Sequence, residues 1–215
     1  MTNKRFWLTA RILAVLVLAA STAALAQGPM PDHFSGILSD YTPLISTLNP
    51  TGPYEIRGHW SLHLKGRSDK ADFSAYMTME LSDSGVAAAG GNLADPKSRG
   101  AHTHHIVMTD AVVSSDPSDT STCPTFSPAN TALFVVTGPA NFISGNGNAA
   151  PFEKLGPTTL QVCISGGTDG TSEVEFSNMT LVMSGPAANK HFGPQPIHGV
   201  VRFPRKSDEG DGDRH

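Results

Sequence analysis

Two neighbouring stretches of the chain alternate apolar and polar residues, which is typical of β-strands that bury one face. The first spans residues 54–65 and the second spans residues 71–81, with a short polar connection at residues 66–70. Trp60 and Leu62, for example, are separated by a serine. The pattern predicts an antiparallel hairpin.

Further stretches that are rich in apolar and β-branched residues, and bounded by glycine, proline or asparagine, are predicted to be strands. They are residues 102–113, 132–137 with a continuation near 140–143, 158–165, 173–183 and 197–203. In residues 102–113 apolar side chains fall on both faces, so the pattern does not define the buried one. Residues 85–100, rich in glycine, alanine and asparagine, are predicted to form a loop.

About seven strands, with no helical stripe of useful length beside them, predict an all-β protein. We expect a single antiparallel β-sandwich over residues 54–206, with a closed β-barrel as the alternative. A chain of 215 residues is long enough for one such domain with one core.

The first 26 residues have the features of an export signal. In residues 1–26, Lys4, Arg5 and Arg11 precede an apolar run that closes on a small-x-small motif at Ala26, which predicts a cleaved secretory signal peptide. Export to the periplasm or the surrounding medium follows from it.

Two further terminal segments flank the predicted domain. Residues 27–53 carry five prolines and little periodicity, so they are predicted to be a lead-in, with one short helical turn within residues 37–48. The acidic tail, residues 207–215, has no large apolar residue and is predicted to be disordered.

The charge balance of the chain argues against a nucleic acid as its partner. Lys plus Arg number 15 against 19 Asp plus Glu, and the predicted signal peptide carries only positive charge. The protein therefore has no basic surplus for a nucleic acid. No transmembrane segment is expected once the signal peptide is removed.

The only two cysteines, Cys123 and Cys163, both follow the predicted export signal and do not form a Cys-x-x-Cys motif. An even number of cysteines in an oxidising compartment predicts one structural disulfide.

Histidine is the side chain in surplus, with nine in the chain. His102 and His104 are two residues apart on a predicted strand, so they share a face with Cα atoms about 7 Å apart and can bind one metal ion together. A third ligand is expected from another strand, and the candidates are His59, His63, His191 and His198. Zinc or copper would suit such a set. The alternative is that His102 and His104 only form hydrogen bonds within the sheet or face solvent.

Other chemistry is not indicated. The chain has no Gly-x-Ser-x-Gly, His-Glu-x-x-His or phosphate-binding glycine loop, so no catalytic or cofactor-binding residue is assigned. Five methionines alternate with Phe and Leu at strand spacing, which favours core packing over copper ligation. They are Met77, Met79, Met108, Met179 and Met183.

Several short motifs carry a resemblance. They are Trp-Ser-Leu-x-Leu at residues 60–64, Ala-Asp-Phe-Ser-Ala at 71–75, His-Thr-His-His at 102–105 and Gly-Val-Val-Arg at 199–202. With these, residues 54–203 resemble a set of exported bacterial all-β proteins of unassigned function, and the resemblance implies no activity. Residues 101–104 also resemble the Ala-His-x-His stretch of chordin-type repeat domains and, more distantly, the histidine strand of copper-zinc superoxide dismutases. A dismutase also needs a bridging histidine and a metal-binding aspartate, which the sequence does not place.

Two functions from different classes follow. The first is a secreted, non-enzymatic β-domain that binds an unidentified ligand or contributes to the cell envelope. The second is an exported zinc- or copper-binding protein centred on His102 and His104. An enzyme that uses a histidine as general base is a third, weaker hypothesis.

Overall fold

The computed structural model describes residues 31–42, 53–66, 68–124, 131–147, 157–168 and 174–202. The predicted signal peptide and the predicted acidic tail lie outside these ranges. The chain divides into two compact units, and the first comprises residues 1–30 and 168–175. Only residues 168, 174 and 175 of that unit are described. The second unit, residues 31–167 and 176–215, contains the features discussed below.

Strands dominate the described residues. They are β1 (His33–Tyr41), β2 (Tyr54–Leu64), β3 (Lys70–Leu81), β4 (His102–Ser114), β5 (Thr131–Pro139), β6 (Phe142–Gly147), β7 (Thr159–Thr168), β8 (Val174–Ser184) and β9 (Ile197–Arg202). The helices are short: α2 (Asp83–Ala88), the 3-10 helix η1 (Pro96–Arg99), α3 (Pro117–Thr120) and α4 (Pro186–Phe192). Among the described residues, no helix has the length and apolar character needed to cross a membrane.

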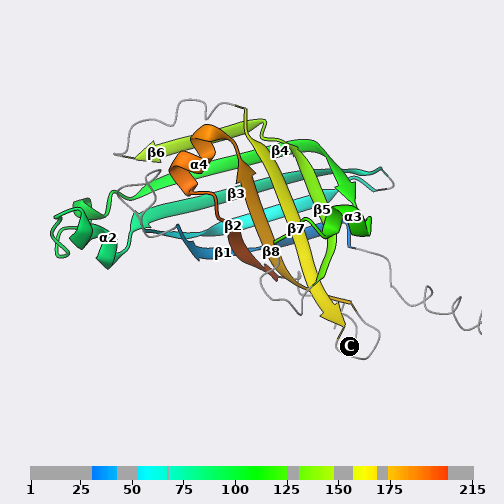
Figure 1. Cartoon of the computed structure of the whole chain (residues 1–215), viewed down its shortest axis with the longest axis horizontal. Coiled ribbons are helices and arrows are strands. Elements are labelled where there is room, and N and C mark those ends of the chain that lie inside the picture. Colours follow the sequence, from blue (N-terminus) through cyan, green and yellow to red (C-terminus); the bar gives the residue numbers. More distant parts are fainter. Residues whose placement is uncertain are drawn as a thin grey trace, which may run out of the picture. The chain divides into compact units, whose positions relative to one another are not determined.

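The sheet closes on itself (Figure 1). Its strands follow the order β3-β2-β1-β9-β8-β7-β5-β4, and β4 pairs back with β3 from Met79↔His102 to Lys70↔Val112. The result is a closed eight-stranded barrel, to which β6 adds along the first half of β4. The all-β prediction is confirmed, and so is its barrel alternative. The sandwich is not found, because the β3–β4 pairing joins the two ends of what would otherwise be an open sheet.

The predicted hairpin is confirmed as β2 and β3, which pair antiparallel from Tyr54↔Leu81 to Leu64↔Ala71. The predicted strand with its continuation after residue 132 is two separate strands, β5 and β6. The predicted loop at residues 85–100 holds most of α2 and all of η1.

Part of the segment expected to be a lead-in is a barrel strand. β1 lies between β2 and β9 and pairs antiparallel with both. Its residues 37–41 are extended where a helical turn was expected, so that prediction is wrong for the described part of residues 37–48. The buried side chains of Phe34 and Leu38 give β1 its inner face, but the run is short and lies between prolines that obscure its period.

Large apolar side chains fill the barrel interior. Phe34 on β1 packs against Phe134 on β5 with ring centroids 5.4 Å apart. Trp60 is 1% exposed beside Gly36, where a Cβ atom would lie 2.7 Å from the indole Nε1 and 1.8 Å from the carbonyl oxygen of Val200. Gly36 therefore allows β1 to approach both β9 and the central tryptophan.

β4 changes phase near its middle, which explains the ambiguous pattern of residues 102–113. Met108 and Ala111 are both buried although they are three positions apart, and the register with β3 shifts opposite residues 71–73. Asp110, with a φ of 53°, lies in this bulge, and its carboxylate accepts a hydrogen bond from Lys65 at 2.6 Å. The extra residue moves apolar positions from one sequence phase to the other.

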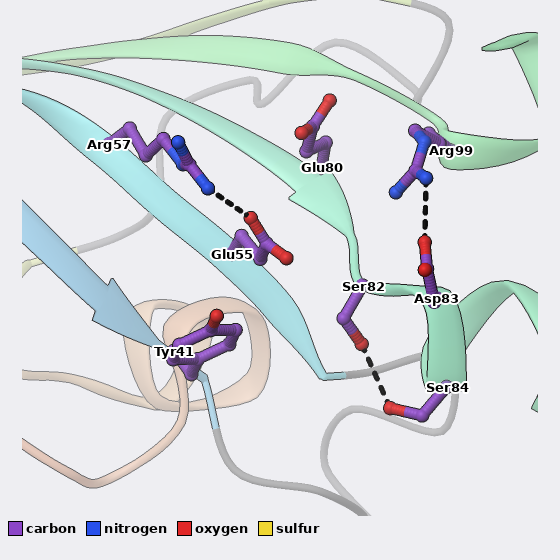
Figure 2. A pocket seen from close by; sticks show the side chains of 8 residues that line it. All are labelled: Tyr41, Glu55, Arg57, Glu80, Ser82, Asp83, Ser84 and Arg99. Carbon is purple, nitrogen blue, oxygen red and sulfur yellow. Dashed lines mark hydrogen bonds and ion pairs between the residues drawn. The ribbon is translucent and has the colours of Figure 1, made fainter.

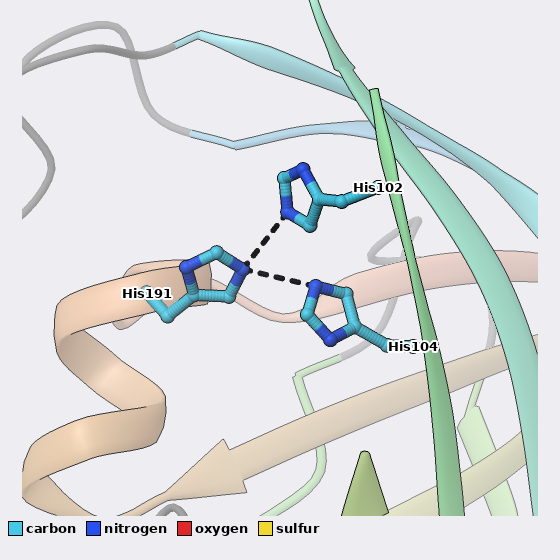
Figure 3. A group of neighbouring side chains, drawn as sticks. All are labelled: His102, His104 and His191. Carbon is cyan, nitrogen blue, oxygen red and sulfur yellow. Dashed lines mark hydrogen bonds between the residues drawn. The ribbon is translucent and has the colours of Figure 1, made fainter. Parts of the chain in front are cut away.

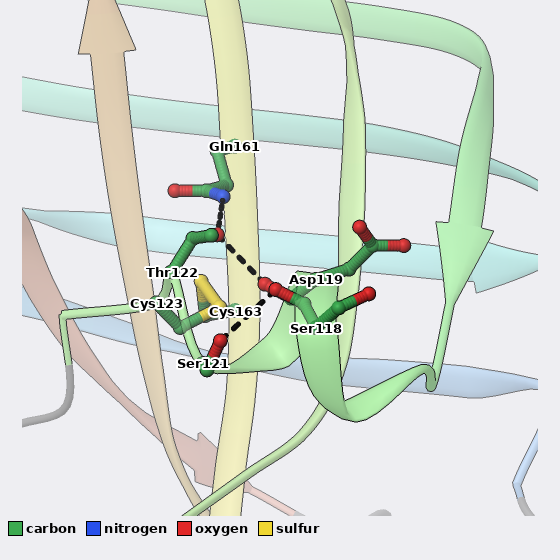
Figure 4. The surroundings of a disulfide bond; sticks show 7 residues. All are labelled: Ser118, Asp119, Ser121, Thr122, Cys123, Gln161 and Cys163. Atoms are coloured by element: carbon green, nitrogen blue, oxygen red, sulfur yellow. Dashed lines mark hydrogen bonds between the residues drawn. A yellow bond between two sulfur atoms is a disulfide. The ribbon is translucent and has the colours of Figure 1, made fainter.

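The predicted disulfide is confirmed. Cys123, just after α3, is bonded to Cys163 on β7, with Cα atoms 6.0 Å apart (Figure 4). The side-chain amide of Gln161 also donates to the Thr122 hydroxyl at 2.9 Å. These contacts hold the α3 turn against β7.

Candidate metal site

Two of the three histidines in the site come from β4. His102 and His104 are 3% and 1% exposed and lie on the inner face of the barrel wall. Their spacing of two residues places them on that face together, because side chains alternate along a strand. Across the sheet they pair with Met79 and Met77 of β3 on one side, and with glycines of β6 on the other.

The third histidine comes from α4, which contributes His191. The helix has proline at its first turn and ends at Gly193, whose φ is 83°. Its buried residues, Ala188 and Phe192, are 0% and 1% exposed and are four positions apart, so they form the packed face. Packing of that face directs His191 towards β4 (Figure 3).

The three imidazoles converge through their Nε2 atoms (Figure 3). Nε2 of His191 lies 3.0 Å from Nε2 of His104 and 3.3 Å from Nε2 of His102. Each residue offers a ligand atom within 4.8 Å of the others. With metal–nitrogen bonds of about 2.0–2.1 Å, two nitrogens of a tetrahedral site lie about 3.3 Å apart. The two separations from His191 therefore match the spacing that one bound ion requires.

The orientation of His102 is fixed by a backbone contact. Its Nδ1–H donates to the carbonyl oxygen of Gly100 at 2.8 Å, since a carbonyl can only accept. In the neutral ring the lone pair is then on Nε2, the atom that faces His191. Metal-binding histidines are typically held by such a contact from the other ring nitrogen.

The electrostatic environment keeps His191 uncharged. Burial, reinforced by the proximity of His104 and His102, lowers the pKa of His191 from 6.5 to about 3. The ring is therefore neutral at physiological pH, and neutral imidazole is the form that binds metals.

Aromatic rings pack against both β4 histidines of the site. Phe192 packs edge-on against His104 with centroids 4.9 Å apart, and Tyr54 packs edge-on against His102 at 5.5 Å. Among the described residues, the group of close donor side chains consists of the three histidines, without a carboxylate or a thiolate. Three neutral nitrogen donors in an apolar setting suit a borderline or soft transition metal.

The other predicted ligands lie elsewhere. His59 and His63 are exposed on the outer face of β2, where His59 stacks on Tyr76 with centroids 5.6 Å apart. His198 on β9 donates from its backbone N–H to the carboxylate of Asp40, and its Nδ1 lies 2.8 Å from the same oxygen. Of the six histidines proposed from the sequence, the structure brings together His102, His104 and His191.

A separate polar hollow lies on the outer surface around the start of β2 and the end of β3 (Figure 2). Each of its two arginines is paired with a carboxylate: Arg57 with Glu55 at 2.8 Å and Arg99 with Asp83 at 2.6 Å. The remaining lining residues are Tyr41, Glu80, Ser82 and Ser84. Both arginines are already engaged by carboxylates and Glu80 adds a further acidic group, so the hollow does not point to a particular ligand.

Comparisons with known proteins add no relatives: no protein-family model, curated protein or solved structure matches the chain. The resemblance to exported bacterial all-β proteins therefore stays a prediction. Function has to be argued from the site itself.

Proposed function

We propose that this protein is an exported β-barrel that binds one transition-metal ion, zinc or copper, through His102, His104 and His191. The observation that carries the proposal is the convergence of three Nε2 atoms, with His191 at 3.0 Å from His104 and 3.3 Å from His102. The function is binding, and no catalytic step is assigned to the site.

A hydrogen-bonded cluster accounts less well for this arrangement. A neutral imidazole has one N–H, so His191 can donate fully to only one of its two neighbours. The contact from His102 to Gly100 also leaves a lone pair on Nε2 of His102. A cation placed among the three nitrogens would satisfy three lone pairs at once.

Export is the second part of the proposal. The basic residues, apolar run and Ala-x-Ala ending of residues 1–26 support it. The Cys123–Cys163 disulfide fits the same assignment, because disulfides persist in oxidising compartments and are rare in the cytosol.

The test is elemental analysis of the chain from residue 27 onwards, purified without chelator and without an affinity tag. We expect about one equivalent of zinc or copper, bound to protein that gains thermal stability from the ion. His191→Ala should lose the ion, because it removes a ligand from a surface helix and leaves the barrel core intact. His59→Ala removes an exposed histidine outside the site and is the matched control, which should keep the ion. Metal-free protein whose melting temperature does not respond to added zinc or copper would overturn the proposal.

A further inference from the structure

The nearest side chains beside the histidine pair on the inner face of β3 are thioethers. Met77 is paired with His104 and Met79 with His102, and both methionines are fully buried. Directly opposite residues on one face of an antiparallel pair have Cβ atoms about 4.5–5.5 Å apart. On the β6 side the paired residues, Gly145 and Gly147, have no side chain to offer. The sheet register therefore places two methionine side chains beside the histidine pair.

The donor set also has no negative charge. The three histidines are neutral as ligands, and His102 is held by the carbonyl of Gly100 rather than by the carboxylate that often supports a zinc-bound histidine. An ion bound here keeps its full charge in a site whose β4 histidines are 3% and 1% exposed. Since the cost of burying an ion grows with the square of its charge, a monovalent ion costs about one quarter of a divalent one.

We propose that the ion is cuprous copper and that the thioether of Met77 or Met79 is its fourth ligand, an inference that rests on the proposed metal-binding function. Thioethers are soft donors that select Cu(I), whereas Zn(II) prefers imidazole, thiolate and carboxylate ligands. Methionine has three rotatable bonds and is unbranched, so its sulfur can reach an ion centred on neighbouring nitrogens. Strand alternation places both methionines in the barrel core. This is compatible with metal binding, because the metal site also lies on the inner face of the barrel.

The experiment is an anaerobic competition between the protein and a chromophoric Cu(I) chelator, with Co(II) binding measured in parallel as a probe of the histidines alone. The variants are Met77→Leu, Met79→Leu and the double variant, because leucine preserves side-chain volume and removes the sulfur. Met108→Leu is the matched control: Met108 is also fully buried on the inner face, but it lies about 13 Å along β4 from His104. Melting temperatures of the metal-free variants establish that any loss of copper is not a loss of fold.

We expect the double variant to bind Cu(I) at least about tenfold more weakly than the wild type, with Co(II) affinity unchanged and Met108→Leu unaffected. X-ray absorption of the copper-loaded wild type should show a sulfur neighbour that the double variant lacks. Unchanged Cu(I) affinity in the double variant, or copper with nitrogen neighbours only, would overturn the cuprous-thioether assignment and leave the three-histidine site standing. If the wild type binds neither Cu(I) nor Co(II), the proposed function itself fails.

Discussion

Nε2 of His191 lies 3.0 Å from Nε2 of His104, although the two residues are 87 positions apart in the chain. One ring is carried by a barrel strand and the other by a seven-residue helix. The contact therefore depends on how firmly α4 is held against the barrel.

Phe192 is the residue that we expect to hold α4 in place, because it is 1% exposed and packs against both His104 and His191. Phe192→Ala should release the helix locally and weaken metal binding at least about tenfold while the barrel stays folded. Hydrogen exchange would report the release as faster exchange of the Asn189 and Gly193 amides, which donate within and just after α4. Unchanged exchange and unchanged affinity would show that α4 is held by other contacts.

The stability of the metal-free protein should fall as the pH is lowered from about 6.5 towards 3. The pKa of His191 is lowered to about 3 in the folded state by burial and by His104 and His102, whereas an unfolded chain takes up this proton near 6.5. Between these values the unfolded state binds more protons, so the free energy of unfolding decreases by up to about 1.4 kcal/mol per pH unit. Urea denaturation at several pH values would measure this slope.

Replacement of His191 by a residue that does not titrate tests whether His191 causes this pH dependence of the unfolding free energy. His191→Gln should flatten the pH dependence in this window, and His59→Gln, an exposed histidine, should leave it as it is. An equal slope in all three proteins would mean that His191 is not the responsible group.

Removal of the disulfide should weaken the fold without removing the metal site. The double variant Cys123→Ala, Cys163→Ala should lose about 2–4 kcal/mol of unfolding free energy, because the unfolded chain regains the freedom of the loop that the bond closes. Metal stoichiometry should remain that of the wild type, since the three histidines are on β4 and α4 and the bond joins the α3 turn to β7. Chemical denaturation combined with elemental analysis checks both parts.

Gly36→Ala should be among the most damaging small substitutions in the barrel. The new Cβ atom would meet the Val200 carbonyl oxygen at 1.8 Å and the Trp60 ring at 2.7 Å, so β1 would have to move away from β9. We expect a loss of at least about 2 kcal/mol, typical of overpacked interiors. Ser39→Ala, at an exposed position on the same strand, should change the free energy of unfolding by less than about 0.5 kcal/mol.

Asp110, in the bulge of β4, has a φ of 53°, and substitutions at this position test how much its left-handed backbone conformation costs in stability. Asp110→Gly and Asp110→Val both remove the ion pair with Lys65, so the difference between them isolates the backbone conformation. Valine should be less stable than glycine by about 1–2 kcal/mol, because a β-branched residue is strained in the left-handed region. Equal stability would imply that the strand straightens at this point.

The hairpin and the shared face of His102 and His104 could be predicted because period-two alternation is a local property of the backbone. The same alternation indicates that His59 and His63 do not belong to the metal site. They alternate with Trp60, Leu62 and Leu64, which places them on the polar face of β2, away from the barrel interior.

The remaining features depend on contacts between distant parts of the chain. The choice between sandwich and barrel rests on the β3–β4 pairing, which no local pattern specifies. His191 could be named as a candidate but not selected, because α4 has only seven residues and its position follows from packing. The bulge at Asp110 shifts the alternation of apolar residues along β4, so the sequence pattern alone does not define the inner face of this strand.

The pairing of β1 with β9 has a consequence for how the protein folds. Residues 35–38 pair with residues 199–202, so the ring can close only when nearly the whole described chain is present. Such a high contact order predicts slow folding, and the partly synthesised chain would expose strand edges. The export proposed above would benefit from this delay, because the barrel cannot close before its last strand has been synthesised.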